Sequence, residues 1–189
     1  TTDITRTYPL GELTEDERLF YTWTLQCHID IAKAVWLDYC DCHMLDTIAR
    51  EPLWRHLINY RCGTGHSVSF VGNVHEGPHA LNGRNTTLMR PGMIVTDEPG
   101  VYETDLVGIR IENELVCVHK ADNQYGTFLG FEPIMFVPIA TSPIVPGVLT
   151  KDELDWLNNY HRQVFEKLAS RLNDEEREWL AKKCAAIGC

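Results

Sequence analysis

The feature that most constrains the fold is an alternation of apolar and polar residues in "LVGIRIENEL", residues 106–115. Its charged side chains fall on every second position, at Arg110, Glu112 and Glu114. Successive side chains of a β-strand point to opposite faces, so the pattern predicts a strand with one apolar and one charged face. The turn sequences "RPGM" and "EPGVY" precede it and favour antiparallel neighbours. Charges on such a face usually meet only water, so this strand alone defines no function.

Other segments predict helices and further strands. Thr14 and Glu17 form a capping box ahead of apolar residues at helical spacing, which predicts a long helix over about Leu13 to Asp38. A shorter helix is predicted over about Leu45 to His56. Strands are predicted over three approximate ranges: Ser67 to Val74, Met93 to Asp97 and Val107 to His119.

In the C-terminal part, residues 134–189, helices are the only regular secondary structure that the sequence predicts. A proline-rich stretch over residues 134–148 reads as an irregular crossing. Beyond it, two capping boxes, Thr150 with Glu153 and Asn173 with Glu176, precede amphipathic patterns and predict two helices. The apolar stripes of these helices fit packing on the same chain or contact with another subunit.

Composition limits the class of protein. The 189 residues, 44% of them hydrophobic, suffice for the core of one domain, with or without an appendage. The net charge of -10 disfavours nucleic acid and anionic lipid as partners, because phosphate binding needs clustered Lys and Arg. No apolar run approaches the roughly 20 residues of a membrane helix, so we expect no insertion into a membrane. Seven cysteines in an irregular arrangement predict free thiols and a cytoplasmic protein.

Two short features bear on the same questions. The sequence "CDCH", residues 40–43, fits half of a zinc knuckle or a plain reduced loop, and no second Cys/His pair stands at a finger-like spacing. The chain opens on the strand-like "TTDITRT" without a methionine, which predicts that it begins inside a domain, as a fragment or a processed product.

The segment "RCGTGHSVSFVGNVHEGPHAL", residues 61–81, places three histidines among glycines and small residues. Glycine permits tight turns and the close approach of a ligand, and imidazole is a common metal ligand that also carries protons near neutral pH. The segment therefore fits an active-site strand that carries His66 and His75. It also fits a glycine-rich hairpin with incidental surface histidines.

Four residues from separate segments have the chemistry of a metal site: Asp3, His66, Glu98 and Glu112. They occupy strand-like positions near turns that contain Gly or Pro, where antiparallel strands can converge. Taken singly, each glutamate is more simply a solvent-facing charge. Taken together, carboxylates and imidazole favour manganese, cobalt, iron or zinc over a structural zinc site rich in cysteine.

The order of "TTDITRT", "GTGHSVSFVGNVHEGP", "DEPGVY" and "GIRIENEL" closely resembles the pita-bread metallopeptidases, specifically the Xaa-Pro aminopeptidase (aminopeptidase P) family. The tail "LTKDELDWLNNYHRQVFEKLASRLNDEEREWLAKKC" resembles the C-terminal domain of the large cytosolic-type members. The resemblance spans nearly the whole chain. It implies an α+β pita-bread fold, truncated at its N-terminus, with a partial catalytic domain over residues 1–133 and a C-terminal helical domain over residues 134–189.

The resemblance also implies an activity and a cofactor. Family members remove an N-terminal residue that precedes proline, using two Mn²⁺ ions, with Co²⁺ or Zn²⁺ as alternatives. By position, Asp3 and Glu112 match the carboxylates that bridge the two metals, and His66 and Glu98 match ligands of one ion. Glu98 is also the implied proton shuttle while metal-activated water attacks the carbonyl carbon.

Further roles follow from the same resemblance. His75 matches a histidine that contacts the substrate or stabilises the tetrahedral intermediate. Arg110 and Tyr102 match residues that orient the metal ligands, as a planar bidentate donor and a phenol can. The partners implied are peptides with proline at the second position, and the tail implies a homodimer of the intact protein.

Two departures from the family pattern modify these expectations. The family's leading aspartate, on a strand upstream of Asp3, lies outside this chain, as does the N-terminal creatinase-like domain. We therefore expect residues 1–189 alone to bind at most one metal ion well and to be nearly inactive. Cys62 stands where the family usually has a substrate-holding histidine, and a thiol is only a weak hydrogen-bond donor.

Two alternatives remain beside the aminopeptidase. A prolidase shares the metal ligands but cleaves Xaa-Pro dipeptides, and the long helical tail argues against it. A pita-bread domain can also be a non-catalytic binding module, as in certain histone chaperones. Retention of His66, Glu98 and Glu112 argues against that alternative, whereas Cys62 and the absent first aspartate favour it.

Overall fold

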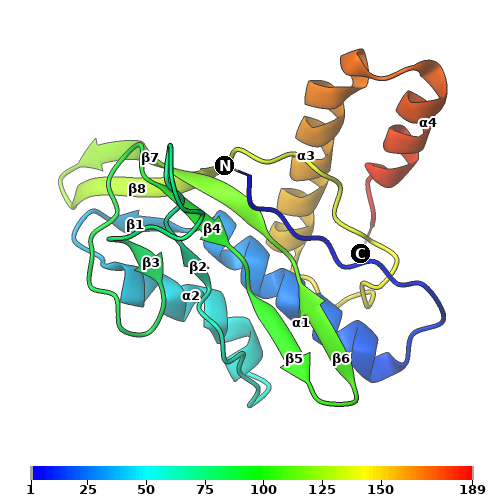
Figure 1. Ribbon diagram of the computed structural model, residues 1–189, viewed down its shortest axis with the longest axis horizontal. Helices are drawn as coiled ribbons and strands as arrows, with labels where there is room; N and C mark the ends of the chain where they lie inside the picture. Colours follow the sequence, from blue (N-terminus) through cyan, green and yellow to red (C-terminus); the bar gives the residue numbers. More distant parts are fainter. Residues whose placement is uncertain (1, 189) are drawn as a thin grey trace.

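The computed structural model describes residues 2–188, drawn in Figure 1. Its helices are α1 (Glu15–Ala32), α2 (Cys42–Trp54), α3 (Lys151–Leu168), the short 3₁₀ helix η1 (Ala169–Arg171) and α4 (Asp174–Lys183). Its strands are β1 (Val35–Leu37), β2 (Gly65–His66), β3 (Ala80–Leu81), β4 (Ile94–Asp97), β5 (Gly100–Glu103), β6 (Val107–Arg110), β7 (Asn113–Asn123) and β8 (Gly126–Pro133). The predicted α+β class is confirmed.

One long antiparallel pair of strands forms the centre of the fold. The main sheet has the order β1-β8-β7-β4, and β5 and β6 form a separate two-stranded ladder. Both ladders have the same register, because Asp97 pairs with Asn113 and Gly100 pairs with Arg110. The chain from β4 to β5 is therefore one interrupted strand, and the chain from β6 to β7 is its partner. The interruption lies between the two ladders, where Pro99 has no N–H to donate.

The N-terminal segment lies alongside this interruption (Figure 1). Thr5 forms an antiparallel bridge with Glu112, whose N–H donates to the Thr5 carbonyl oxygen at 3.0 Å. The next side chain, Arg6, donates to Asn113 Oδ1 at 2.8 Å and to the Tyr160 hydroxyl at 2.8 Å. Arg6 thus fastens the N-terminal segment to both β7 and α3.

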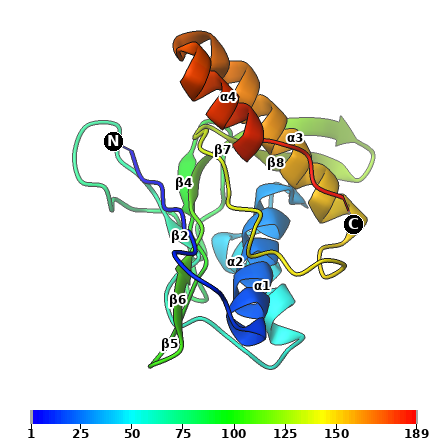
Figure 2. The same cartoon turned by 90° about the vertical axis from the view of Figure 1, so that its right-hand side faces the viewer.

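Helices α1 and α2 cover one face of the sheet, as the side view in Figure 2 shows. The apolar core of this layer is closed to solvent and includes Ile31, Leu45, Ala49, Val95, Leu115 and Leu129. Burial of these side chains is the main stabilisation that holds the helices to the sheet. The opposite face of the sheet carries the charged residues of "GIRIENEL", which are Arg110, Glu112 and Glu114.

The C-terminal helices pack beside α1 through a second apolar core. This core joins the two helices α1 and α3 through Leu25, Ile29, Leu157 and Val164. At the same contact, Gln26 donates to Glu153 Oε2 at 3.0 Å. All three predicted capping boxes are present, at the N-termini of α1, α3 and α4. The stretch 134–148 is irregular, as predicted.

Several boundaries differ from the sequence predictions. The first helix ends at Ala32 rather than near Asp38, because residues 35–37 form β1 and pair with β8. The predicted strand over 67–74 is wrong, since these residues form a loop after the two-residue strand β2. The predicted strand over 107–119 is split into β6 and β7. Strands β5 and β8 were not among the sequence predictions.

Within residues 2–188, no helix has both the length and the apolar character needed to span a membrane.

Candidate metal centre

The proposed carboxylate ligands lie at the interruption between the two strand ladders. There the backbone N–H of Glu98 donates to the Thr64 carbonyl oxygen at 2.7 Å, and that of Glu112 donates to Thr5. Each glutamate is thus held by a second segment of chain that carries another predicted ligand two residues away, His66 or Asp3. This backbone pattern explains why four residues distant in sequence meet at one place.

His66 is held against β4 in a defined orientation. Its backbone N–H donates to Thr96 Oγ1 at 2.9 Å, and the preceding Gly65 lies so close to β4 that a Cβ atom would stand 1.7 Å from the Thr96 carbonyl oxygen. The imidazole Nδ1 lies 3.1 Å from the Ser67 carbonyl oxygen, a partner that can only accept. Nδ1 therefore carries the proton of the neutral ring and Nε2 presents its lone pair.

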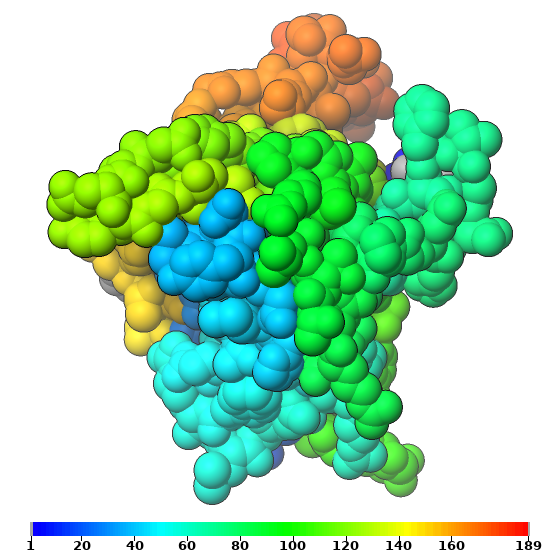
Figure 3. All heavy atoms as spheres, turned by 90° about the vertical axis from the view of Figure 1, so that its left-hand side faces the viewer, coloured from blue at the N-terminus to red at the C-terminus, as the bar shows by residue number. Residues whose placement is uncertain are grey.

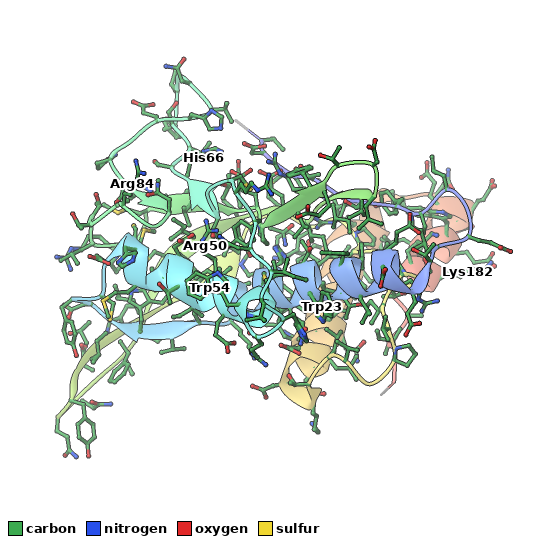
Figure 4. All side chains as sticks on the ribbon, turned by 90° about the horizontal axis from the view of Figure 1, so that it is seen from below. Trp23, Arg50, Trp54, His66, Arg84 and Lys182 are labelled. Atoms are coloured by element: carbon green, nitrogen blue, oxygen red, sulfur yellow. The ribbon has the colours of Figure 1, made fainter. Side chains whose placement is uncertain are left out.

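The Nε2 atom of His66 faces two carboxylates. It lies 3.1 Å from Glu98 Oε1 and 3.4 Å from Asp3 Oδ2, on the side of the sheet away from α1 (Figure 4). Nε2 is buried, and no described residue gives it a hydrogen bond of normal geometry. A lone pair and two carboxylates repel one another unless a proton or a metal cation lies between them.

The protonation equilibria reflect this concentration of charge. Burial opposes a charged His66 ring, but the Glu98 carboxylate and the Ser67 carbonyl oxygen outweigh it and raise the pKa of His66 above its usual value. Burial also works against ionised Glu98, yet the adjacent His66 ring, a hydrogen bond from the Thr96 hydroxyl and the Arg110 charge together lower the pKa of Glu98. Glu98 is therefore a carboxylate at neutral pH.

Glu112 has the opposite shift. Burial raises its pKa to about 7, and the neighbouring charges of Glu98 and Asp3 add to the rise, while a hydrogen bond from the Thr5 hydroxyl opposes it. Asp3 is positioned by its backbone N–H, which donates to Glu114 Oε1 at 2.9 Å. The carboxylates of Glu112 and Asp3 therefore raise each other's energy when both are ionised, and a bound cation or proton relieves this repulsion.

The other two histidines of residues 61–81 differ in environment. His75 is exposed on the loop 67–79, which projects from the body of the molecule in Figure 3. Its ring meets the His66 ring edge to face, with the centroids 3.9 Å apart. His79 is buried, and its Nε2 lies 2.7 Å from the Ile94 carbonyl oxygen. His75 therefore joins the candidate site, whereas His79 helps to hold the loop to β4.

Arg110, Tyr102 and Cys62 lie on the β5–β6 side of the site. Arg110 Nη1 is 3.4 Å from Glu98 Oε2, and its guanidinium lies 5.7 Å from the centre of the half-exposed Tyr102 ring. The Cys62 thiol donates to the Gly100 carbonyl oxygen at 3.5 Å. Arg110 therefore contacts Glu98 directly, Tyr102 contacts Arg110, and Cys62 is held to the first residue of β5.

The donor set fits a hard divalent cation. Carboxylate oxygens and an imidazole with a free Nε2 are suitable ligands for Mn²⁺, Co²⁺ or Zn²⁺. Among the described residues, no group of three His, Cys, Asp or Glu side chains already has the spacing of a complete ligand set. The buried and unsatisfied His66 Nε2, aimed at two carboxylates, is the observation that supports the fit.

The "CDCH" segment is structural. Asp41 caps α2 by accepting from the Met44 N–H at 3.0 Å, and Cys42 is fully buried in the core. The six cysteines within residues 2–188 are free thiols.

Several polar residues that support the site were not predicted from the sequence. Thr5 and Thr96 donate to the Glu112 and Glu98 carboxylates, and such hydroxyl contacts leave no sequence signature. Asp97 and Asn113 could have been noticed, because both are polar at positions where the two-residue period predicts burial. Both are fully buried on the opposite face of the sheet.

Two family profiles match the chain. The profile described as "Metallopeptidase family M24" matches residues 1–119, and that described as "C-terminal region of peptidase_M24" matches residues 127–187.

Curated relatives include "Aminopeptidase P1" of Lotus japonicus and "Aminopeptidase P2" of Arabidopsis thaliana. The first is 42% identical over 195 residues, covering 100% of this chain, and the second is 43% identical over 187 residues, covering 95%. The chain spans only 29% and 26% of the length of these two relatives.

Two solved structures of similar proteins also match this chain in fold. X-prolyl aminopeptidase from Caenorhabditis elegans, described as a cytosolic enzyme with a di-nuclear active site, matches with a TM-score of 0.91 and 36% identity over 98% of this chain and 31% of its own. Prolidase from Pyrococcus furiosus matches with a TM-score of 0.59 and 28% identity over 70% of this chain and 36% of its own. The pita-bread fold expected from the motifs is confirmed.

Proposed function

Because the chain belongs to metallopeptidase family M24, we propose that it supplies most of the active site of a metal-dependent Xaa-Pro aminopeptidase. This enzyme would hydrolyse the bond between an N-terminal residue and a following proline. The observation that carries the proposal is the convergence of Asp3 and Glu98 on the free Nε2 of His66. The likeness to X-prolyl aminopeptidase over 98% of the chain supports the choice of substrate.

The proposed metal ligands are Asp3, His66, Glu98 and Glu112, with Mn²⁺ as the proposed ion. When bound, the metal would lower the pKa of a water molecule and polarise the scissile carbonyl group. The family's first aspartate lies outside this chain, so we expect residues 1–189 alone to hold at most one ion well. A calorimetric titration of the isolated chain that found two tight Mn²⁺ sites would contradict this expectation.

The protein side chains have separate tasks in the proposed reaction. Glu98 takes up the proton of the attacking water at a carboxylate oxygen, since its lowered pKa keeps it ionised at neutral pH. Arg110 lies beside Glu98 Oε2 and fixes the orientation of that carboxylate. His75, exposed and in contact with His66, is placed to meet the substrate carbonyl group. Tyr102 lies under Arg110 and limits its movement.

We also propose partners and a compartment. The substrates are peptides with proline at the second position, and Cys62 takes the place of a substrate-holding histidine. The cytoplasm is supported by the relative described as cytosolic and by the free thiols. A homodimer is supported by the apolar hollow between α3 and α4, lined in part by Phe165, Ala181 and Ala186. Light scattering of the full-length protein would test the dimer.

The decisive experiment combines metal analysis with hydrolysis by the full-length protein. We expect bound Mn²⁺, and release of the first residue from Arg-Pro-Pro in preference to cleavage of an Xaa-Pro dipeptide. Glu98→Gln should lower kcat by at least about 100-fold, since it removes the proton acceptor. Glu103→Gln, on the same strand pair but at its far end, is the matched control and should keep full activity.

Other outcomes would replace the proposal. Cleavage restricted to dipeptides would assign a prolidase. A folded protein without metal or hydrolysis would assign a binding module.

A further inference from the structure

A buried polar pair lies directly behind the two glutamates of the candidate metal centre. Asp97 and Asn113 are opposite each other in the β4–β7 ladder, at its last pair before the interruption. Each is one residue from a proposed ligand, Glu98 or Glu112, so its side chain points to the other face of the sheet. Asp97 and Asn113 are both 0% exposed.

His28 of α1 joins this pair from the helix layer. Its Nδ1 is 2.9 Å from Asp97 Oδ2 and 3.3 Å from the Asp97 carbonyl oxygen, and its Nε2 is 3.3 Å from Asn113 Nδ2. The Asn113 amide orientation is fixed independently, because Arg6 donates to Asn113 Oδ1. Nδ2 therefore faces His28 as a donor, so His28 Nε2 accepts and Nδ1 carries the proton toward Asp97.

The Asp97 carboxylate has only one ion-pair partner among the described residues, the His28 imidazole, to compensate for its burial. Both of its carboxylate oxygens are buried, and among the described residues they receive no hydrogen bond of normal geometry. The imidazole 2.9 Å away is therefore the group that offsets the cost of burying this carboxylate. His28 is itself 0% exposed and is covered by Trp156 of α3, whose ring lies edge on at 5.9 Å.

We propose that His28 is a positioning residue for the metal centre: from the far side of the sheet, it sets the separation of the Glu98 and Glu112 carboxylates. This inference rests on the proposed function, because it takes those two glutamates as metal ligands. The β4–β7 ladder ends at the Asp97 and Asn113 pair, and pairing resumes only at Gly100 and Arg110, beyond the two glutamates. At the last pair before the glutamates, the His28 imidazole contacts both side chains and restrains the two strands.

A simple structural role is the alternative explanation of a buried histidine. The two roles differ in what they change. A structural residue affects the stability of the whole fold, whereas a positioning residue affects ligand spacing and therefore metal affinity and coordination. Loss of groups that orient metal ligands typically weakens metal binding by about 10- to 100-fold.

The test measures Mn²⁺ affinity by calorimetry, the visible absorption of the Co²⁺-loaded protein, and the melting temperature, all on the full-length protein. His28→Leu removes both contacts, and we expect about 10-fold weaker Mn²⁺ binding and an altered Co²⁺ band. His28→Gln can still donate to Asp97 and accept from Asn113, so it should restore affinity to near the wild-type value. His28→Asn is too short to reach both and should give an intermediate loss.

The chain offers a matched control in His161. This histidine is also 0% exposed and accepts a backbone hydrogen bond, from Ile139 at 3.0 Å, but it lies on α3. His161→Leu should lower the melting temperature and leave metal affinity and the Co²⁺ band unchanged.

Each outcome decides between the hypotheses. Unchanged affinity and an unchanged Co²⁺ band in His28→Leu would refute the positioning role, as would equal losses in the His28 and His161 variants. If His28→Leu does not fold, equal affinities of His28→Gln and His28→Asn would refute it. A folded wild-type protein that binds no Mn²⁺ would overturn the proposed function as well.

Discussion

At Gly65 the chain approaches β4 so closely that no side chain fits. The Thr96 carbonyl oxygen occupies the place of a Cβ atom, at 1.7 Å, and Thr96 also holds the next residue through its hydroxyl group. This close approach brings His66 to the carboxylates. The glycine in "GTGH" is therefore required by packing, and its substitution should disturb the fold and the site together.

We predict that Gly65→Ala lowers the free energy of unfolding by about 3 kcal/mol, because the backbone of β2 or β4 must move to admit the methyl group. Urea denaturation at neutral pH measures this change. Gly63→Ala is the control two residues away, where a Cβ would lie 3.5 Å from its nearest neighbour. The control should change stability by less than about 0.5 kcal/mol, and similar losses in both variants would contradict the steric explanation.

Sequence patterns predicted which charged residues converge at the candidate metal centre, but they did not predict the contacts that fix the positions of these residues. Asp3, His66 and Glu98 do converge, as their residue types and the family resemblance led us to expect. Their roles as metal ligands stay predictions. The hold of Thr96 on His66 is a cross-strand contact and that of His28 on Asn113 is a helix-to-sheet contact, and no local pattern encodes such contacts.

Among the elements, helix starts were the most predictable feature. A capping box acts over four residues, so Thr14, Thr150 and Asn173 are recognisable from the sequence alone. The box at Thr150 has a second role, because Glu153 also accepts from Gln26 of α1. The start of α3 is thereby tied to the helix that carries His28.

We predict that Thr150→Ala lowers the free energy of unfolding by about 1 kcal/mol, the usual cost of losing an N-cap side chain. Chemical denaturation followed by circular dichroism provides the measurement. Thr104→Ala, in the exposed turn between β5 and β6, is the matched control and should be neutral within about 0.5 kcal/mol. Equal stability of the Thr150→Ala and wild-type proteins would exclude a stabilising cap.

Strands were less predictable, since their partners are distant in sequence. Val35–Leu37 looked like the end of a helix, but its backbone is paired with β8, more than 90 residues later. Residues 67–74 contain strand-forming side chains but lie in a loop, where Phe70 is 98% exposed. β-propensity describes how a side chain fits a pleated surface, so a segment without a pairing partner does not become a strand.

At the scale of the whole molecule, Arg6 and α3 join the N-terminal and C-terminal parts. Arg6 bonds to the Tyr160 hydroxyl, and the adjacent His161 is buried among the residues that Arg6 reaches. Burial, together with the positive charge of Arg6, lowers the pKa of His161 from 6.5 to about 4. The folded protein therefore keeps this imidazole neutral at pH values where the unfolded chain binds a proton.

We predict that acid weakens the fold through His161. Between pH 6.5 and pH 4 the unfolded state binds more protons at this residue, so the free energy of unfolding falls as the pH falls. The loss from His161 between pH 7 and pH 5 is about 2 kcal/mol. Urea denaturation at both pH values should show a smaller loss in His161→Gln, and an unchanged loss in the exposed-site control His119→Gln. An unchanged loss in His161→Gln would contradict the assignment.

The two strand ladders share one register, so the tip of the β5–β6 hairpin and the interruption between the ladders differ in how well they tolerate inserted residues during evolution. A residue added at the tip, next to Asp105, lengthens the turn and leaves every pair behind it intact. A residue added between Arg110 and Asn113 would shift the strand by one position relative to its partner. Side-chain direction alternates along a strand, so Glu112 would then face α1 and the adjacent buried side chain would face the opposite surface. Lineages that share this fold can thus remodel the hairpin tip, which lies away from the site, whereas a single insertion near the interruption would displace the glutamates that form the site.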